Sequence, residues 1–345
     1  MPVIHALVLP VRVAIIFSNS VGLAVDAKVI EQALAHHAKI MNVDLDVQQI
    51  KLPWQLYFRK KPISFDRLKL AGRPDAIIFL ENIVECDPPI DPDIPKVLIP
   101  NPEWINTRSE RLLPIIHQVW HKSRFSRERL AVRMPDATHH YTGFTSLDPS
   151  VTVRGYGSFA HFRGKATSRH SEEVLAVWQN NPQFPQLHYQ FYQEQADNFE
   201  FPEWLSWNNV AIRAGHMARD AYVQALGANG IHLCTSASEG FGHYINEARA
   251  MSAVAVVLDA PPMNELIDGE CGVLLSPCGE RPLKFGVHYQ LSAAELERGV
   301  NAIVMLAAED LATMGRNARR RFLAEREAFV ERIGPLLEAL VQSTS

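Results

Sequence analysis

Residues 231–258 read IHLCTSASEGFGHYINEARAMSAVAVVL, and this stretch decides the fold class. Its two ends, Ile231–Thr235 and Val254–Leu258, are short apolar runs typical of strands that are buried on both faces. Between them lie a glycine-rich turn and a helical segment that begins near His243. Strands that alternate with helices indicate a parallel sheet covered by helices on both faces.

The same alternation extends outward over both halves of the chain. Apolar runs predict strands, and segments with apolar residues at helical spacing lie between them. Besides the two strands above, the predicted strands are Val11–Phe17, Val43–Val47, Asp75–Leu80, Pro95–Ile99, Ser158–Phe162 and Leu187–Phe191. The predicted helices include Val25–Leu34, Leu112–His121, His170–Gln179 and Ala214–Leu226.

A turn-rich segment, Pro135–Ser150, interrupts this alternation and predicts a domain boundary. We therefore expect an N-terminal domain of residues 1–145 and a C-terminal domain of residues 146–320. Residues 321–345 predict a helix that packs back on the N-terminal domain and is interrupted at Gly334-Pro335. The predicted fold class is α/β, with two Rossmann-like domains whose parallel sheets face each other across a cleft.

Composition excludes several classes of protein. Apolar residues make up 47% and charged residues 21% of the 345 residues, which is ordinary for a globular chain. The formal net charge of −4 disfavours a dedicated nucleic-acid binder. The 4 cysteines form no Cys-x-x-Cys pair, so neither a zinc knuckle nor a disulfide framework is indicated. No apolar run reaches the roughly 18 residues of a membrane span, and no signal peptide is indicated, so we expect a cytoplasmic protein.

The turn before His243 carries the residues with the clearest chemistry. Free N–H groups and the dipole at the start of a helix suit a phosphate group, and Gly240 and Gly242 permit a tight turn in front of it. Glu239 precedes this helix and Glu247 lies in its first turns. Because a carboxylate accepts hydrogen bonds from vicinal hydroxyls, the pattern suits a nucleoside diphosphate sugar, with ribose on one side of the diphosphate and hexose on the other.

The Glu239-x7-Glu247 spacing, with Gly-Phe-Gly inside it and Ala255–Asp259, Glu265 and Gly272–Leu275 after it, resembles the GT-B retaining glycosyltransferases, in particular glycosyltransferase family 4 (group 1). The resemblance implies that Glu239 contacts hydroxyls of the donor sugar and belongs to the catalytic residues. It also implies that Glu247 contacts the ribose and that the amides of Gly240, Phe241 and Gly242 face the diphosphate. Retention of the anomeric configuration is implied in the same way. Independence from metal is expected because Lys165, Arg169 and these amides would neutralise the phosphates.

A basic turn from Phe162 to His170 is the second part of the resemblance. Family members place an arginine and a lysine here against the donor diphosphate. In this chain Lys165 takes the arginine position and Arg169 the lysine position, so the two cations are exchanged, with Arg163 close by in the chain. The expected catalytic residues are thus Glu239, Lys165 and Arg169.

Residues besides the three catalytic ones are also expected to contact the donor. The donor-binding residues include Arg163, Gly240, Phe241, Gly242 and Glu247, together with Gly22 in the first loop of the N-terminal domain. Ile212, within residues 209–213, is expected in the pocket for the nucleotide base. We expect no metal and no cofactor, and the partners are the nucleotide-sugar donor and a sugar, lipid-linked or other hydroxyl acceptor.

Two other motifs lack the structural context that their usual function needs. Gly155-x-Gly157-x-x-Ala160 matches a dinucleotide fingerprint, but the residues after it predict a strand where that motif needs a helix. The Asp-x-Asp pairs at Asp44 and Asp91 are typical of metal-dependent glycosyltransferases of another fold, but they do not follow strands as required.

Two alternatives stay open from the sequence. The basic and aromatic segment 51–73 indicates an acidic acceptor, a peripheral contact with an anionic membrane at its inner face, or a solvated surface. The rival function is a non-catalytic protein of glycosyltransferase-like fold that binds a nucleotide sugar or a partner enzyme.

Overall fold

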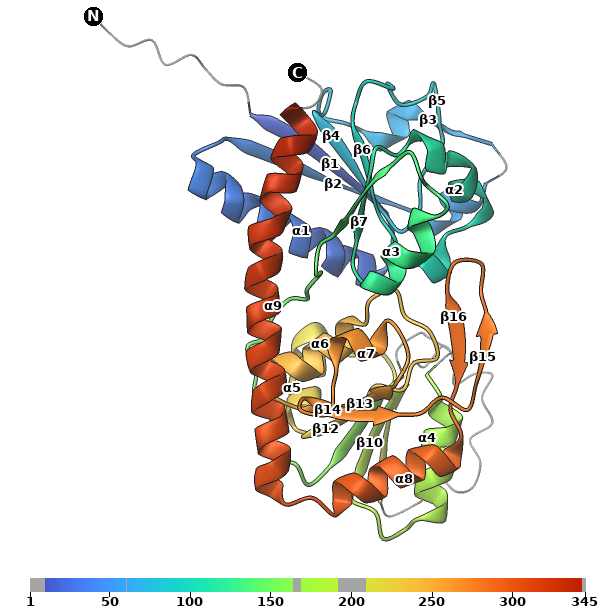
Figure 1. Cartoon of the computed structure of the whole chain (residues 1–345), viewed down its shortest axis with the longest axis vertical. Coiled ribbons are helices and arrows are strands. Elements are labelled where there is room, and N and C mark those ends of the chain that lie inside the picture. Colours follow the sequence, from blue (N-terminus) through green and yellow to red (C-terminus); the bar gives the residue numbers. More distant parts are fainter. Residues whose placement is uncertain (1–9, 60, 164–168, 192–208, 343–345) are drawn as a thin grey trace, which may run out of the picture. The chain divides into compact units, whose positions relative to one another are not determined.

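The computed structural model describes residues 10–59, 61–163, 169–191 and 209–342. The chain divides into two compact units: Met1–Ser146 together with Glu325–Ser345, and Leu147–Ala324. Each unit is built on a parallel sheet with helices against it (Figure 1). The predicted α/β class with two Rossmann-like sheets is therefore confirmed.

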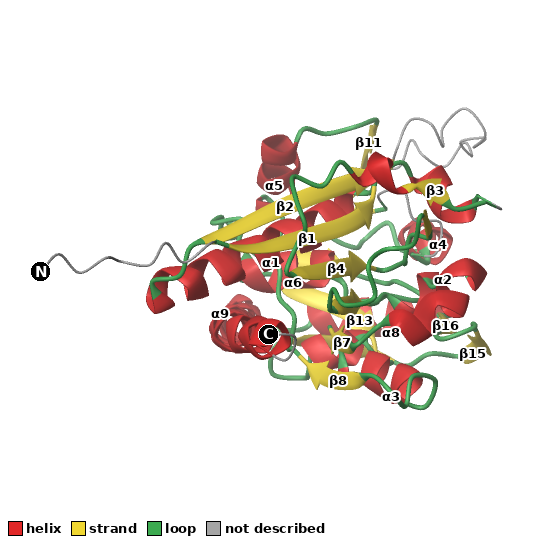
Figure 2. Ribbon diagram, turned by 90° about the horizontal axis from the view of Figure 1, so that it is seen from above, coloured by secondary structure: helices red, strands yellow, loops and turns green. Residues whose placement is uncertain are grey.

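In the first unit, six of the described strands form a parallel sheet in the order β2-β1-β4-β6-β7-β8, and the arrowheads of β1 and β4 point the same way in Figure 2. The chain passes from β1 to β2 on one side and then returns to β4 on the other. The carboxyl ends of β1 and β4 thus form a topological switch point, where ligands bind in sheets of this type. The strands are β1 (Val11–Ser18), β2 (Leu45–Leu52), β4 (Ala76–Leu80), β6 (Lys96–Ile99), β7 (Gln118–His121) and β8 (Thr138–Tyr141).

Helices and short turns complete the first unit. The helix α1 (Val21–Met41) begins after Ser20, whose hydroxyl accepts the Leu23 N–H at 3.2 Å and so caps it. The other helices are α2 (Thr107–Leu112) and α3 (Arg124–Ala131), and a small parallel pair is formed by β3 (Ile63–Ser64) and β5 (Cys86–Asp87). The 3-10 turns are η1 (Trp54–Phe58), η2 (Phe65–Leu68), η3 (Pro102–Trp104) and η4 (Leu113–Ile115).

In the second unit, six of the described strands form a parallel sheet in the order β11-β10-β9-β12-β13-β14, so its switch point lies between β9 and β12. The strands are β9 (Phe159–Phe162), β10 (Leu187–Phe191), β11 (Val210–Ala214), β12 (Ile231–Leu233), β13 (Val254–Leu258) and β14 (Gly272–Leu275). An antiparallel hairpin follows, β15 (Gly279–Pro282) and β16 (Val287–Gln290). The helices are α4 (Ser171–Asn180), α5 (Arg219–Gly227), α6 (His243–Ala250), α7 (Met263–Leu266) and α8 (Ala293–Val304).

The helix predicted for Leu112–His121 is wrong, because its second half is the strand β7. Pro114 lacks the N–H that a continuing helix needs, and the chain leaves α2 through the turn η4. Val119 and Trp120 are then fully buried, and Val119 pairs with Leu98 of β6. The turn-rich segment Pro135–Ser150 likewise contains the strand β8. Tertiary pairing therefore overrides the local pattern at both places.

The predicted interruption at Gly334-Pro335 is also wrong: α9 (Ala308–Gln342) continues through Pro335. A side chain at Gly334 would collide with the His37 ring of α1, so this glycine permits close packing of the two helices. His37 Nε2 also pairs with Glu338 at 3.0 Å, and Phe329 packs edge-on against Phe144. These contacts within the first unit hold the helix despite the proline.

Other predicted helix boundaries differ from the structure by a few residues. Gly22 is expected in a loop, but α1 begins at Val21 and includes it. The helix predicted from Ala214 begins at Arg219, and Ala214 ends the strand β11 instead. Of the aromatic side chains in the basic segment 51–73, Trp54 and Phe58 lie at the surface, 56% and 61% exposed, whereas Tyr57 is buried. The membrane contact stays a prediction.

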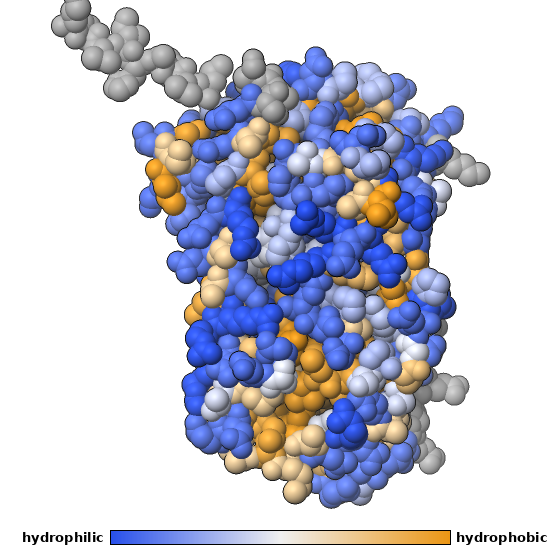
Figure 3. Space-filling view, in the orientation of Figure 1, coloured by the Kyte–Doolittle hydropathy of each residue, from blue (hydrophilic) through white to orange (hydrophobic). Residues whose placement is uncertain are grey.

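None of the described helices is long and apolar enough to cross a membrane. The face drawn in Figure 3 is largely hydrophilic, with apolar areas on both units. One such area lies at the C-terminal end of α1, where Ile40 is 67% and Met41 50% exposed.

Candidate functional site

The predicted donor motif lies at the switch point of the second unit, in the loop that joins β12 to α6. Gly242 ends this loop in the left-handed region, with φ 95°, which disfavours any residue with a side chain. A Cβ at this position would also approach the Ile245 side chain to 2.9 Å. Gly242 is the N-cap residue of α6 and has no side chain that could cap the helix, so the start of this helix suits an anion.

Glu239 is half-buried in this loop and is held by a neighbour. The Ser236 hydroxyl donates to Glu239 Oε1 at 2.7 Å, while the Ser236 N–H donates to the Tyr244 hydroxyl at 3.2 Å. The Tyr244 hydroxyl donates in turn to the Cys234 carbonyl oxygen at 3.0 Å. The carboxylate is thus fixed to the loop, and its remaining lone pairs can accept hydrogen bonds from hydroxyl groups.

Arg169 is brought against the start of α6. Its guanidinium lies over the Tyr244 ring, 4.2 Å from the centroid, and its Nη1 donates to the Phe162 carbonyl oxygen at 2.6 Å. Burial lowers the pKa of Arg169, but the interactions with Tyr244 and Glu239 outweigh this and raise its pKa on balance. The side chain is therefore a charged, positioned cation beside the uncapped helix.

The other basic residues of this turn are only partly described. Lys165 lies outside the described residues, so its catalytic role stays a prediction. Arg163 follows β9, and its N–H donates to the Gln190 carbonyl oxygen at 2.9 Å. The Nε atoms of Arg163 and Arg169 are buried and have no hydrogen-bond acceptor among the described residues. Two guanidinium donors at this switch point are therefore unused by the described chain, which suits an anionic ligand.

Glu247 is 6% exposed and is held by two residues of α5. Arg219 Nη2 pairs with Glu247 Oε1 at 2.6 Å, and the Tyr222 hydroxyl donates to Oε2 at 3.1 Å. Glu247 is thus a held carboxylate and not a solvated helix position. Sequence reasoning missed both partners, and only the helical spacing of Arg219 and Tyr222, one turn apart, could have indicated them.

The remaining predicted contacts are Gly22 in the first unit and Ile212 and Phe241 in the second. Gly22 stands in the first turn of α1 in the first unit, and a Cβ there would meet no atom within 4 Å. Ile212 lies on β11, an edge strand of the second sheet, in register with Tyr189 of β10. Phe241 is buried with 4% exposure and packs edge-on against His243, so it anchors the loop while its amide stays in the turn.

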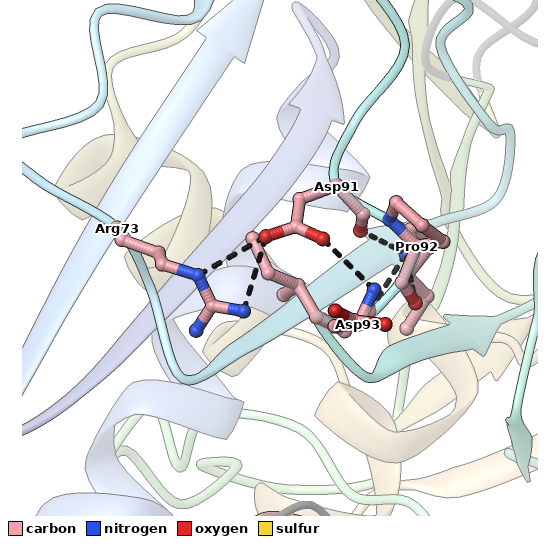
Figure 4. A network of polar contacts seen from close by, with 6 residues as sticks. Arg73, Asp91, Pro92 and Asp93 are labelled. Atoms are coloured by element: carbon pink, nitrogen blue, oxygen red, sulfur yellow. Dashed lines mark hydrogen bonds and ion pairs between the residues drawn. The ribbon is translucent and has the colours of Figure 1, made fainter.

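The second Asp-x-Asp pair forms part of a closed polar network in the first unit (Figure 4). Asp91 Oδ2 accepts from Arg73 Nε and Nη2, both at 3.1 Å, and Asp91 Oδ1 accepts the Asp93 N–H at 2.9 Å. Lys96 donates to the Asp91 carbonyl oxygen at 2.8 Å. The Asp91 carboxylate thus holds a turn and an arginine.

A buried histidine, His161 on β9, lies beneath the donor loop. Its Nδ1 faces the Leu233 carbonyl oxygen at 3.0 Å, which can only accept, so Nδ1 carries the proton. Its Nε2 then accepts from the Ser171 hydroxyl at 2.8 Å. Burial lowers the pKa of His161 to about 3, and the charges of Arg169 and Arg163 act in the same direction. The ring is therefore neutral in the folded protein.

Acidification is expected to destabilise the protein through this residue. Because the pKa of His161 is lowered on folding, the unfolded chain takes up a proton below about pH 6.5 and the folded chain does not. Stability is thus complete above pH 6.5 and falls toward pH 3, by about 1.4 kcal/mol per pH unit. Urea unfolding at pH 7.5, 6.5 and 5.5 measures this slope, and it should become shallower in His161→Asn. An equal slope in both proteins would contradict the assignment.

Comparisons with known proteins agree on the fold. No family model matches the sequence, and no curated protein matches it. Among solved structures, sucrose-phosphate synthase from Thermosynechococcus elongatus is similar with a TM-score of 0.69 and 13% identity, covering 96% of this chain and 99% of that one. Anabaena HepE in complex with UDP and glucose is similar with a TM-score of 0.61 and 15% identity, over 96% and 99% of the two chains.

A third structure extends the comparison. The lipopolysaccharide outer core galactosyltransferase WaaB is similar with a TM-score of 0.56 and 13% identity, covering 92% of this chain and 98% of that one. All three similarities span nearly the full length of both chains, and so include both parallel sheets. The chain therefore has the fold of the GT-B glycosyltransferases.

Proposed function

We propose that this protein is a glycosyltransferase that moves a sugar from a nucleoside diphosphate sugar to an acceptor hydroxyl. One observation carries the proposal: the uncapped start of α6 lies beside the Arg169 guanidinium, with Glu239 before the helix and Glu247 within it. An anion site flanked by two carboxylates suits a diphosphate that has a sugar at each end. Similarity to HepE in complex with UDP-glucose supports the same substrate class.

The proposed chemistry needs no protein nucleophile. As the bond from the sugar to the diphosphate breaks, negative charge grows on the leaving group. Arg169, Lys165 and the amides of the glycine loop stabilise this charge, an electrostatic role like that of an oxyanion hole. Glu239 accepts hydrogen bonds from the donor sugar, and a diphosphate oxygen takes the acceptor's proton on the same face. Retention follows from the family resemblance, metal independence follows from this neutralisation of the phosphates, and both belong to the proposal.

Glu247 keeps its expected contact with the ribose in this proposal, and two further residues support it. With Arg219 and Tyr222 already bonded to it, one donor per oxygen, the carboxylate still has acceptor sites for the ribose hydroxyls. We propose that Arg219 and Tyr222 position Glu247 for this contact.

The substrate class is tested by ligand binding and by turnover. A thermal-shift screen with UDP, GDP, ADP, CMP and dTDP should find one nucleotide that raises the melting temperature, because it binds only the native state. Release of nucleoside diphosphate from a panel of donor sugars, with and without simple acceptors, then measures catalysis, and EDTA should leave it largely intact. Binding without release would favour the non-catalytic rival, and strict dependence on manganese or magnesium would contradict metal independence.

The two glutamates are expected to differ in their kinetic effects. Glu247→Ala should weaken donor binding, since ribose contacts are present before and during the reaction. Glu239→Ala should mainly lower turnover, because contacts with the sugar strengthen as its bond breaks. Steady-state kinetics on the identified donor separate the two effects, with the exposed Glu309→Ala as the control. Full activity in both variants would remove the proposed donor site.

A further inference from the structure

The carboxylate of Glu81 lies at the switch point of the first unit. No sequence motif assigns a function to this position. Glu81 follows β4 directly, beside the end of β1, and adopts a left-handed backbone conformation with φ 68°. Its side chain is half-buried. In a doubly wound sheet this crevice at the carboxyl ends of the strands is where a ligand binds.

Two amide side chains are oriented toward the Glu81 carboxylate. Asn101, which follows β6, accepts from Lys122 Nζ at 2.8 Å through Oδ1, so its Nδ2 is turned to Glu81 Oε2 at 2.9 Å. Asn82 accepts the Asn106 N–H at 2.9 Å through Oδ1, so its Nδ2 is turned to Glu81 Oε1 at 3.3 Å. A cation and a backbone N–H thus decide which way each amide faces, and the carboxylate is held with one donor on each oxygen.

The support for Asn101 continues into the core. Lys122, at the end of β7, forms an ion pair with Asp26 of α1, and these two side chains are each 2% exposed. Asp26 is therefore committed to Lys122, whereas Glu81 retains partial exposure and free acceptor sites. Asp26 therefore has a structural role, whereas Glu81 can contact a ligand.

A buried hydroxyl gives a second and independent indication of a ligand. Tyr57 is 2% exposed, and its hydroxyl has no hydrogen-bond partner among the described residues. Burial raises the pKa of Tyr57, and the charge of Glu81 contributes to this rise. A buried hydroxyl is normally hydrogen-bonded, so this donor, which senses the charge of Glu81, is left for a group outside the described residues.

An exposed aromatic ring completes the set. The Trp104 carbonyl oxygen accepts from Asn82 Nδ2 at 3.1 Å, which ties Trp104 to the side chain that holds Glu81. Its indole is nevertheless 65% exposed. A sugar presents hydroxyl groups at its edge and C–H groups on its faces, so a carboxylate, an amide and an open indole match its chemistry.

We propose that Glu81 binds hydroxyl groups of a neutral, polyhydroxylated acceptor, with Asn101 as the adjacent polar contact and Trp104 as the apolar surface. This deepens the proposed function, on which the word acceptor rests. It also sets a specificity: the carboxylate repels a phosphate, so the part of the acceptor bound at Glu81 is an uncharged sugar. The acidic acceptor considered from the basic segment 51–73 is thereby disfavoured at this position.

The test is binding of sugars to the full chain, with and without saturating UDP. Glucose, galactose, N-acetylglucosamine, maltose and lactose are titrated while tryptophan fluorescence is followed, and glucose 6-phosphate is the charged comparison. At least one neutral sugar should bind, and more tightly than glucose 6-phosphate. Glu81→Gln should weaken that binding by about tenfold at an unchanged melting temperature. Trp104→Ala should also weaken it, Trp104→Phe should restore part of it, and the exposed Glu128→Gln should leave it unchanged.

The outcomes separate this proposal from the transferase itself. If UDP binds but no neutral sugar in the panel does, or if Glu81→Gln binds sugar as the wild type does, the site at Glu81 is wrong and the donor site stands. If sugar binding depends on Glu81 but no nucleotide binds, the carbohydrate site stands and the transferase proposal falls.

Discussion

Replacing Arg169 with alanine is expected to lower the rate of sugar transfer by about a hundredfold. The guanidinium lies 4.2 Å from the Tyr244 ring centroid at the start of α6. In the proposed reaction, negative charge grows there on the leaving diphosphate. Removing one preorganised charge at such a site costs on the order of 3 kcal/mol in the barrier. Turnover on the identified donor measures the loss, and Lys165→Ala should produce a loss of the same order.

The melting temperature of Arg169→Ala must be measured as well, because the contacts of Arg169 also stabilise the folded protein. The bond of Arg169 to the Phe162 carbonyl oxygen and its stack on Tyr244 predict a measurable fall in melting temperature for Arg169→Ala. Arg169→Lys keeps the charge and loses the planar stack, so it should retain more activity than alanine. The exposed Arg316→Ala is the matched control. Transfer at the wild-type rate in folded Arg169→Ala would show that the donor site is misplaced.

The largest effect on stability is expected at Lys122. Lys122→Ala removes one partner of an ion pair whose side chains are each 2% exposed and leaves the Asp26 carboxylate buried without its cation. Breaking such a pair typically lowers the free energy of unfolding by about 3–5 kcal/mol. Urea unfolding of the full chain measures the loss. The unfolding transition of the first unit, which contains both residues, should move to a lower urea concentration.

Two controls test whether burial causes the loss of stability. Replacing both partners with apolar residues, Asp26→Leu with Lys122→Met, should recover most of the lost stability, because no unpaired charge remains. Arg316→Ala breaks a pair with Glu309 whose side chains are 60% and 79% exposed, and its effect should be well below 1 kcal/mol. Equal effects at the buried and the exposed pair would contradict the assigned role of burial.

The sequence by itself determined the class of fold and the place of the donor motif. The strands Leu187–Phe191 and Val254–Leu258 are found with the predicted bounds, because a short apolar run between turn residues carries its own signal. The turn at Gly242 is equally local, since its φ of 95° requires glycine whatever surrounds it. Spacing within one segment was enough to place Glu239 in the loop before α6 and Glu247 within that helix.

Tertiary structure alone decided what contacts these residues. Arg219 reaches Glu247 from another helix, and Glu81, Asn101 and Lys122 follow three different strands. No local pattern links such residues, because they meet only when the carboxyl ends of parallel strands are brought to one edge of a sheet. For the same reason β7 is a strand and α9 runs unbroken past Pro335: sheet pairing and helix packing contribute more free energy there than local propensity.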